Sequence, residues 1–461
     1  MKETNVCNEK MTFQECELAI LRAAVDKAEL IQQKNVARSP EIKKLIYLVE
    51  NFIRKNKLIC YGGTAINNIL PKQDQFYNKD VEIPDYDFFS PTPVEHAKRL
   101  ADIYAKNGFG DIEAKAGVHY GTYKVFVNFI PVADITYMPK ELFYTLKRSS
   151  IRVDGILYAP PNYLRMAMYL ELSRPAGDVS RWEKVLKRLI LLNKNYYITT
   201  LECEKMNFQR PMEDTKNQSI IYKVVENTFI DQGCVFIGGY ALSIYSQYMP
   251  KSLRYKLRKI PDFDVISEEP EKTAQIVKER IMDQGITHVK IKKHSGIGEI
   301  IAPHYEIKVG ADTVAFVYKP IACHSYNIIK IRGYEIKIAT IDTLLSFFLA
   351  FLYADRPYYD PERIVCMARF LFEVQERNRL EQKGLLKRFS LSCIGHQQTL
   401  EEIKAEKSKK YKELKDKMNS KEYEEWFLRY VPIEHKKTSK KQPKNIHKKT
   451  RKNYKQKVFN K

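Results

Sequence analysis

The sequence contains no hydrophobic run long enough to cross a membrane. Its longest apolar stretch, near Leu344 to Tyr353, falls well short of the roughly 20 residues that a membrane helix needs. The polar N-terminus, which includes Lys2 and Glu9, has no apolar segment of the kind that a secretory signal requires. Hydrophobic residues nevertheless make up 44% of the chain, which is enough for a sizeable core. We therefore expect a globular protein without a membrane partner.

Cysteine pairs at metal-binding spacing are also absent. The eight cysteines are scattered, and none forms a Cys-x-x-Cys pair, so the sequence indicates neither a zinc site nor a disulfide framework. We expect reduced thiols in a cytosol-like compartment. The positions are Cys7, Cys16, Cys60, Cys203, Cys234, Cys323, Cys366 and Cys393.

Acidic residues are few compared with basic ones. There are 56 Asp and Glu against 78 Lys and Arg, which gives a net charge of +22. The segment from His435 to Lys461 holds 12 basic and no acidic residues, which leaves +10 for the rest of the chain. A basic body with a basic tail suits a polyanionic partner, either a nucleic acid or an acidic membrane surface. On its own, such a tail is expected to be a solvated, disordered extension.

The first 57 residues predict two helices. Helix-forming residues at helical spacing run from Met11 to Lys34. Ser39 followed by Pro40 is a start signal for a second helix, which we expect to end near Arg54 or Lys57.

Asp85 and Asp87 form the first candidate site, inside the apolar run Ile83 to Phe89. Residues i and i+2 of an extended strand face the same side, so the two carboxylates are expected to be neighbours. Neighbouring carboxylates repel each other unless a cation lies between them. A hard divalent cation such as Mg²⁺ is the usual partner of such a pair.

A glycine pair precedes these aspartates. Gly62 and Gly63 follow the strand-like segment Leu58 to Tyr61, and Thr64 begins a helix-like segment. A glycine turn at the start of a helix offers free N–H groups to phosphate. Either motif alone is more often a tight turn or a solvated loop. Together and in this order, they indicate a phosphate cradle beside a metal site.

The combination resembles the signature of the DNA polymerase β-like nucleotidyltransferase superfamily. That superfamily uses a third carboxylate on a later strand, and Asp134 matches it at the end of the alternating segment Tyr123 to Tyr137. The spacing from Gly63 to Asp85 is longer than the commonest pattern. The extra length falls in the polar segment from Lys72 to Lys79, which we interpret as an inserted loop.

A predicted basic helix, Ser180 to Asn193, follows the candidate catalytic segment. Arg181 and Lys184 share one of its faces. Composition alone favours a solvated basic face. However, the stretch resembles the segment after the catalytic domain in the poly(A) polymerases of large DNA viruses, which implies that Arg181 and Lys184 bind the triphosphate. Trp182 and Tyr197 offer rings for base stacking, although such rings more often belong to a core.

The motifs recur once, in an incomplete form. Gly238-Gly239 repeats the glycine pair, and Asp262 and Asp264 repeat the aspartate pair at nearly the same offset, which indicates an internal duplication. The third carboxylate is not repeated, since the spacing places Ala315 at its position. One complete and one degenerate copy resemble the catalytic poly(A) polymerase subunit of poxviruses and giant viruses.

The predicted fold is therefore α+β, with two tandem nucleotidyltransferase-like domains, each a mixed sheet with helices. The first is expected to be catalytic and the second degenerate. The predicted divisions are a helical N-terminal segment, the catalytic domain, the degenerate domain, and a segment that is helical and then a disordered basic tail, covering residues 1–57, 58–200, 201–400 and 401–461.

The resemblance implies a template-independent adenylyltransferase that adds AMP from ATP to RNA 3′ ends, as in mRNA polyadenylation. Two Mg²⁺ or Mn²⁺ ions would be held by Asp85, Asp87 and Asp134. Gly62 and Gly63 would let the backbone approach the phosphates, and Thr64 would donate its hydroxyl or N–H to them. The expected setting is a viral factory in the host cytoplasm, or the virion. Related enzymes act as homodimers or with a separate stimulatory subunit, and no residue of this sequence chooses between these two.

RNA binding has candidate residues of its own. A basic stripe before the second aspartate pair either contacts RNA or is a solvated face, and it consists of Arg254, Lys256, Arg258 and Lys259. Two alternative functions remain open. One is a noncatalytic RNA-binding or processivity subunit, and the other is a related enzyme such as a tRNA nucleotidyltransferase or an oligoadenylate synthetase.

Overall fold

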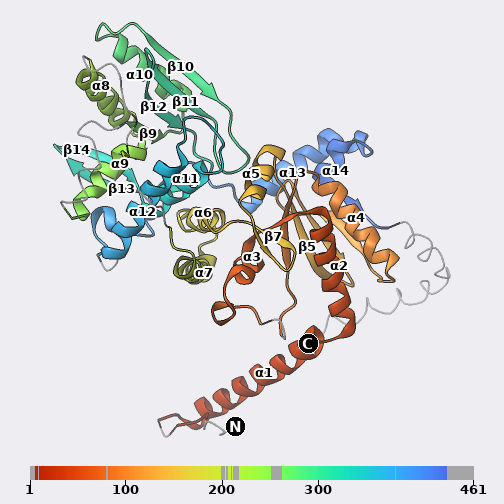
Figure 1. Ribbon diagram of the computed structural model, residues 1–461. Coiled ribbons are helices and arrows are strands. Elements are labelled where there is room, and N and C mark those ends of the chain that lie inside the picture. Colours follow the sequence, from red (N-terminus) through yellow and green to blue (C-terminus); the bar gives the residue numbers. More distant parts are fainter. Residues whose placement is uncertain are drawn as a thin grey trace, which may run out of the picture.

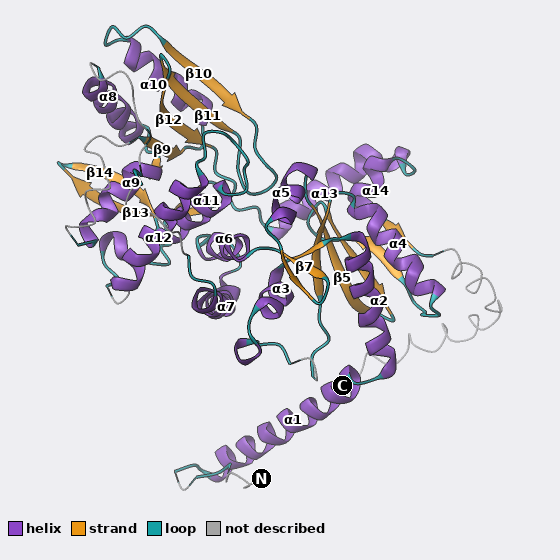
Figure 2. Ribbon diagram, in the orientation of Figure 1, coloured by secondary structure: helices purple, strands orange, loops and turns teal. Residues whose placement is uncertain are grey.

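The computed structural model describes residues 6–8, 10–78, 81–198, 203, 206–208, 210, 217–250, 262–378 and 381–432. Helices and two mixed β-sheets make up this part of the chain, so the α+β class expected from the sequence is confirmed. The two sheets lie on either side of a central group of helices that includes α6 (Pro161–Leu172) and α11 (Ile341–Phe351) (Figures 1 and 2).

The first sheet and its helices come mainly from the N-terminal half of the chain. The helices there are α1 (Phe13–Ala37), α2 (Pro40–Asn56), α3 (Gly62–Ile69), α4 (Pro93–Lys106), α5 (Lys140–Arg148), α6 and α7 (Trp182–Asn195). The strands are β1 (Ile59–Cys60), β2 (Tyr86–Ser90), β3 (Glu113–Ala116), β4 (Thr122–Val127), β5 (Ile130–Tyr137), β6 (Ile151–Val153) and β7 (Ile156–Tyr158).

The second sheet and the C-terminal elements follow. The helices are α8 (Gln218–Asp231), α9 (Gly238–Tyr245), α10 (Pro270–Met282), α11, α12 (Pro361–Arg377), α13 (Leu400–Leu414) and α14 (Lys421–Phe427). The strands are β8 (Val235–Ile237), β9 (Phe263–Ile266), β10 (Val289–His294), β11 (His304–Val309), β12 (Asp312–Tyr318), β13 (His324–Ile331), β14 (Tyr334–Ala339), β15 (Cys393–Ile394) and β16 (Arg429–Tyr430).

The two sheets repeat the same order of seven strands. The first sheet has the order β16-β3-β4-β5-β2-β1-β7-β6, and the second has β10-β11-β12-β9-β8-β14-β13-β15. The central pairs also agree in direction, since β2–β5 and β9–β12 are parallel whereas β1–β2 and β8–β9 are antiparallel. This is the arrangement that a duplication predicts. The sheets differ at their edges, where β16 extends the first and β15 the second.

Both helices expected at the N-terminus are present. The Ser39 hydroxyl caps α2 by accepting from the N–H of Ile42, and Pro40 occupies the first turn. The helix ends where Lys57 adopts a left-handed conformation with φ of 51°. Its buried face is Ile42, Leu45, Val49, Phe52 and Ile53. By contrast, α1 extends away from the body of the protein (Figure 1).

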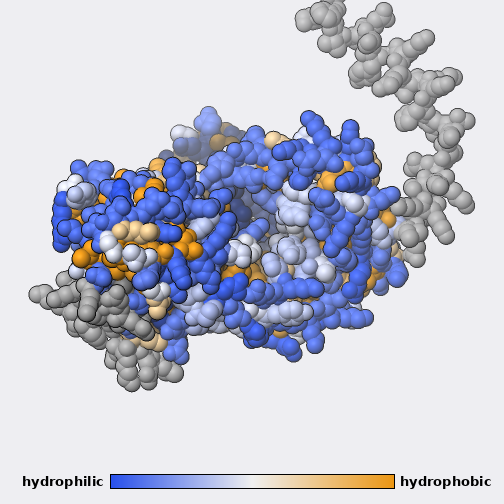
Figure 3. All heavy atoms as spheres, turned by 90° about the horizontal axis from the view of Figure 1, so that it is seen from above, coloured by the Kyte–Doolittle hydropathy of each residue, from blue (hydrophilic) through white to orange (hydrophobic). Residues whose placement is uncertain are grey.

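The longest apolar stretch of the sequence lies in the centre of the protein. Every residue of α11 is buried, and the helix packs against α6 and α12. Most of its residues are apolar, and its polar side chains Asp342, Thr343 and Ser346 are buried as well, so it is a core helix. None of the helices that the structure describes is both long and apolar enough to cross a bilayer. Viewed from above, the surface is mostly hydrophilic, with smaller apolar patches (Figure 3).

The C-terminal elements return to the first sheet. β16 pairs with β3, and α14 packs beside the same strand. The Tyr123 hydroxyl donates to the backbone oxygen of Glu425 at 2.7 Å, and the Tyr430 hydroxyl donates to Asp102 Oδ1 at 2.7 Å. After residue 400 the chain forms α13 and α14, whereas the basic tail, from residue 433 on, lies outside the described residues.

The expectation of reduced thiols is wrong for six of the eight cysteines. Disulfides join Cys7 to Cys16, Cys203 to Cys366 and Cys323 to Cys393, and Cys60 and Cys234 are free and buried. Two of these pairs are 163 and 70 residues apart in the chain, yet their Cα atoms lie 5.4 and 5.2 Å apart. Sequence spacing cannot reveal pairs that only the tertiary fold brings together.

Candidate active site

The three aspartates proposed for catalysis lie on neighbouring strands. Asp87 is in β2, Asp85 directly precedes that strand, and Asp134 is in β5. β2 and β5 are parallel, and in their register Asp87 stands opposite Asp134. Paired residues of adjacent strands point to the same face of a sheet, so these two carboxylates share one face.

The electrostatics of this face are those of crowded carboxylates. Burial, and then the charges of Asp85 and Asp134, raise the pKa of Asp87 to about 7. Burial and then Asp134 likewise raise the pKa of Asp85. The Oδ1 atom of Asp134 is buried without a hydrogen-bond partner. The site therefore attracts positive charge.

A lysine supplies part of that charge. Lys124 of β4 stands opposite Asp134 in the antiparallel register, and its Nζ forms an ion pair with Asp134 Oδ2. Within the described residues, no group of three or more histidine, cysteine, aspartate or glutamate side chains is arranged to hold a metal ion. The donor set still fits a hard cation, because it consists of carboxylate oxygens, one of them buried and unpartnered.

The glycine pair opens α3, as expected, but each glycine has a different reason to lack a side chain. Gly62 has φ of +72°, and a Cβ there would lie 2.7 Å from Asp87 Oδ2. A Cβ at Gly63 would lie 2.6 Å from the Tyr77 hydroxyl and 2.9 Å from Arg188 Nη1. Gly62 thus makes room for a carboxylate, whereas Gly63 makes room for a tyrosine and an arginine.

The Thr64 hydroxyl is not available to a phosphate in this structure. It donates to the backbone oxygen of Asp85 at 2.6 Å and thereby ties the start of α3 to the approach of β2. Of the two donors predicted for the phosphate, the hydroxyl and the N–H of Thr64, only the N–H therefore stays a candidate. No side chain caps the N-terminus of α3, so its first-turn N–H groups face the cavity without a side-chain acceptor.

These elements line a cavity of about 1080 Å³, which is large enough for a nucleoside triphosphate. Gly62, Gly63, Asp85, Asp87, Arg181 and Lys184 all line it. Arg181, just before α7, lies close enough to Asp87 to lower its pKa slightly, and its Nε is 3.2 Å from Glu171 Oε1. Thr64 also lines the cavity, whereas Asp134 is not among its lining residues and stands opposite Asp87 in the register of β2 and β5.

Two residues to which the sequence assigned no definite role, Tyr77 and Arg188, stand directly on the glycine turn. Arg188 Nη2 donates to the Tyr77 hydroxyl at 2.6 Å, and both side chains line the cavity. Tyr77 belongs to the supposed inserted loop, which is held in place because Asn67 Oδ1 accepts from the N–H groups of Phe76 and Tyr77, each at 2.8 Å. Arg188 follows Arg181 by two helical turns, and that spacing was the available signal.

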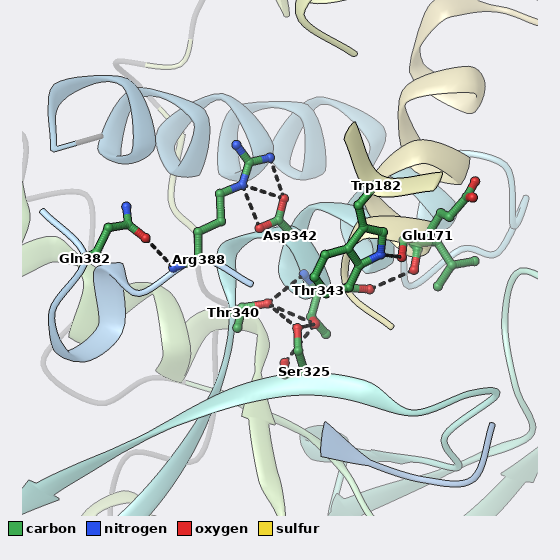
Figure 4. A network of polar contacts seen from close by, with 10 residues as sticks. Glu171, Trp182, Ser325, Thr340, Asp342, Thr343, Gln382 and Arg388 are labelled. Carbon is green, nitrogen blue, oxygen red and sulfur yellow. Dashed lines mark hydrogen bonds and ion pairs between the residues drawn. The ribbon is translucent and has the colours of Figure 1, made fainter. Parts of the chain in front are cut away.

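Trp182 does not stack over the cavity. Its Nε1 donates to the backbone oxygen of Glu171 at 3.0 Å, and its ring lies 5.4 Å from that of Phe389. Figure 4 shows this indole at the contact between α6 and the second sheet's helices, near the ion pair of Arg388 with Asp342. Neither Trp182 nor Tyr197 lines the cavity, so among the described residues neither is placed to stack a base there.

The counterpart of Asp134 in the second sheet is Phe316. β9 and β12 are parallel, and Asp264 stands opposite Phe316 in their register, as Asp87 stands opposite Asp134. The sequence spacing had indicated Ala315, which is wrong by one residue. The register of β12 against β9 differs by one position from that of β5 against β2. The sequence nevertheless predicted correctly that the second sheet has no carboxylate opposite Asp264.

The four residues of the predicted RNA-binding stripe, Arg254, Lys256, Arg258 and Lys259, lie outside the described residues. Their role stays a prediction.

Transfer of a nucleotide requires hard oxygen ligands next to a cradle for phosphate groups, and the cavity offers both. A nucleotidyltransferase is the class of protein that the fold and this cavity indicate.

The comparisons with known proteins point to one family within that class. Residues 47–178 match the model of the family described as poly(A) polymerase catalytic subunit. The expected resemblance is thus confirmed for the segment that carries the glycine turn and all three aspartates, whereas Arg181 and Lys184 lie just beyond it.

Individual relatives agree. The chain is 35% identical over 207 residues to a putative poly(A) polymerase catalytic subunit of African swine fever virus (strain Badajoz 1971 Vero-adapted), which covers 44% of this chain and 42% of that protein. It is 31% identical over 204 residues to the putative subunit of Acanthamoeba polyphaga mimivirus, covering 43% and 33%. The matches therefore span less than half the length of these curated relatives.

A solved structure extends the likeness of the fold to almost the whole chain. The crystal structure of the Megavirus polyadenylate synthase aligns with a TM-score of 0.76 over 95% of this chain and 91% of that chain, at 18% identity. The two-sheet α+β architecture is therefore the fold of that protein.

Proposed function

We propose that this chain is a template-independent polynucleotide adenylyltransferase that transfers AMP from ATP to RNA 3′ ends. The observation that carries this proposal is the register of β2 and β5, which sets Asp87 opposite Asp134 on the face next to the glycine turn. The family match over residues 47–178 supports the choice of reaction within the class.

The residues of the candidate site have the following proposed roles. The N–H groups of Gly63 and Thr64 bind the triphosphate at the start of α3. Arg181, Lys184 and Arg188 neutralise the charge that grows on the leaving pyrophosphate. Two Mg²⁺ or Mn²⁺ ions, held by Asp85, Asp87 and Asp134, would activate the RNA 3′-hydroxyl and stabilise the charge on the phosphate oxygens.

Lys124 has a role of its own when no divalent cation is present. Its ammonium group balances part of the charge of Asp134, which limits the repulsion among the carboxylates in the empty cavity. Asp134, once released by Lys124, is the carboxylate placed to accept the proton of the attacking hydroxyl.

The proposal also covers the organisation of the chain. The segment 58–200 forms the catalytic domain and 201–400 a noncatalytic domain of the same ancestry, preceded by the helices of residues 1–57. The basic residues after 432 add phosphate contacts to RNA. The expected setting remains a viral factory or the virion, and a second copy or a stimulatory subunit remains the expected partner.

The proposal is tested by extension of a short labelled RNA with each NTP in the presence of Mg²⁺ or Mn²⁺. We compare the wild type with Asp85→Asn/Asp87→Asn and with the matched pair Asp262→Asn/Asp264→Asn in the second sheet. Expected are long products with ATP alone, lost in the first pair and retained in the second, provided that thermal melting shows both variants to be folded.

Two results would contradict the proposal. RNA binding without extension by any nucleotide would leave the noncatalytic RNA-binding subunit. Incorporation of CMP as well as AMP, to form a short defined sequence at the RNA end, would favour a tRNA nucleotidyltransferase.

A further inference from the structure

The second sheet repeats the aspartate pair with the same backbone geometry. Asp264 lies against Gly238, whose φ is +64°, and the space of the missing Cβ is taken by the Asp264 carboxylate. Gly62 and Asp87 have the same relation in the first sheet. The framework for a pair of carboxylates is therefore retained in both sheets.

The surroundings of the second pair differ in charge. Arg210, from the segment that connects α7 to α8, contacts both carboxylates. Its Nε lies 3.0 Å from Asp262 Oδ2, and its Nη2 lies 3.0 Å from Asp264 Oδ1. The guanidinium carbon lies 4.8 Å from the centre of the Phe316 ring, which stands where the first sheet has Asp134.

This ion pair is shielded from water. The side chains of Arg210, Asp262 and Asp264 are only 14%, 5% and 10% exposed. Burial alone would lower the pKa of Arg210, but Asp262 and then Asp264 raise it above its usual value, so the guanidinium stays charged. Arg363 of α12 also interacts electrostatically with both aspartates. Arg210 thus contacts both carboxylates, and the charge of Arg363 adds to the positive charge around them.

We propose that Arg210 is a built-in cation that takes the place of divalent ions in the second sheet, so that this site binds neither a metal ion nor a metal-bound nucleotide. A divalent cation would need the carboxylate oxygens that the guanidinium already uses, and it would find no third carboxylate at Phe316. The residues of the second site therefore do not fit the ion that the first site fits.

The same contact fixes the connecting segment. Cys203 forms a disulfide with Cys366 of α12, and the ring of Phe208 lies 5.6 Å from that of Phe370 on the same helix. Arg210 adds an ionic anchor a few residues further on. The segment that leaves the first sheet is thus attached to the second sheet's former catalytic face, and the carboxylates serve the architecture of the chain.

Metal binding tests this proposal without any reference to catalysis. The full-length chain with Asp85→Asn/Asp87→Asn, which removes ligands of the first site, is titrated with Mn²⁺, and free Mn²⁺ is followed by electron paramagnetic resonance. We expect no binding that depends on Asp262 and Asp264. Adding Arg210→Ala is expected to create a site for about one Mn²⁺ per chain, and adding Asp262→Asn/Asp264→Asn to this variant is expected to abolish it.

Thermal melting in EDTA gives a second, independent readout. Arg210→Ala removes the one guanidinium that the structure shows in contact with both buried carboxylates, so the melting temperature is expected to fall by several degrees. Arg210→Ala/Asp262→Asn/Asp264→Asn is expected to recover much of this loss, because the uncompensated charges are gone. The rescue distinguishes a charge effect from a loss of packing.

Three outcomes would overturn the proposal. They are Mn²⁺ binding that depends on Asp262 while Arg210 is intact, a folded Arg210→Ala variant that gains no Mn²⁺ site, and an Arg210→Ala variant that melts like the wild type. None of them bears on RNA extension by the first site, so the proposed function stands or falls separately.

Discussion

At the scale of single residues, Gly62 meets two requirements at once. Its positive φ is one that an L-residue adopts only with strain, and its missing side chain leaves room for the Asp87 carboxylate. Gly108 shares only the first requirement, since it has φ of +83° and, apart from its chain neighbours, nothing lies within 4 Å of its hypothetical Cβ. The two glycines therefore separate backbone strain from steric conflict.

Gly62→Ala is expected to destabilise the protein by about 3 kcal/mol or more and to abolish activity, because strain and a displaced Asp87 add together. Gly108→Ala is expected to cost only about 1–2 kcal/mol and to remain active. Chemical denaturation with RNA extension measures both. Equal losses of stability would show that Asp87 yields to the new methyl group without cost.

Asp87 itself makes the cation-free protein sensitive to pH. Its pKa is about 7 in the folded protein and about 4 in an unfolded chain. Between these values the folded state keeps a proton that the unfolded chain releases, so the free energy of unfolding falls as the pH rises through this window.

Asp87→Asn removes this penalty, since the amide does not ionise. In EDTA, its melting temperature is expected to exceed that of the wild type by a few degrees at pH 8 and by much less at pH 5. Melting curves at both pH values check this. An advantage of the same size at pH 5 would attribute it to packing instead of charge.

At the scale of elements, α7 turns a cationic face toward the cavity and another toward solvent. Arg188 stands on the glycine turn with Tyr77, whereas Lys187 is 72% exposed and pairs with Glu183 on the same helix. Arg188 and Lys187 are adjacent basic residues of one helix, so they are matched in charge and differ in the direction of the side chain.

Arg188→Ala is expected to lower kcat/KM for ATP about tenfold or more, since a charged hydrogen-bonding group at the phosphate site is lost. Lys187→Ala is expected to change it less than twofold, as is usual for a solvated ion pair. Steady-state kinetics with varied ATP make the comparison. Similar effects of the two changes would mean that general positive charge, and not position, matters.

At the scale of the whole molecule, the C-terminal elements belong to the first sheet although the second sheet precedes them in the chain. β16 covers the edge of β3, and Lys98 Nζ forms a 2.5 Å ion pair with Glu424 of α14. The ring of Trp426 lies 4.4 Å from that of Tyr120. The first sheet is therefore completed by residues far from it in sequence.

A chain that ends at Gln398 is expected to melt several degrees below the full chain, because it exposes the β3 edge and the contacts of α14. A chain that ends at Pro432 keeps these elements and is expected to melt like the full chain. Differential scanning calorimetry measures the melting temperature of both truncated chains and of the full chain. Equal melting of the shorter chain would show that α13, α14 and β16 add no stability.

Much of this protein could be predicted from local sequence. The Ser39-Pro40 signal set the start of α2, and the glycine pair opened α3. Asp87 and Asp134 fell on the expected strands, because periodicity and turn chemistry act over a few neighbouring residues. The repeated motifs likewise indicated two related sheets. These features depend on short-range geometry, which the order of residues determines by itself.

Only the tertiary structure decided which distant residues meet. Register between strands placed Lys124 on Asp134 and Phe316 opposite Asp264, and loop packing brought Tyr77 and Arg188 onto Gly63. The disulfides, the Arg210 ion pair and the return of β16 to β3 also join segments that are remote in the chain. The physical reason is the same in each case, since such contacts follow from how complete elements pack, and no local pattern of residues encodes them.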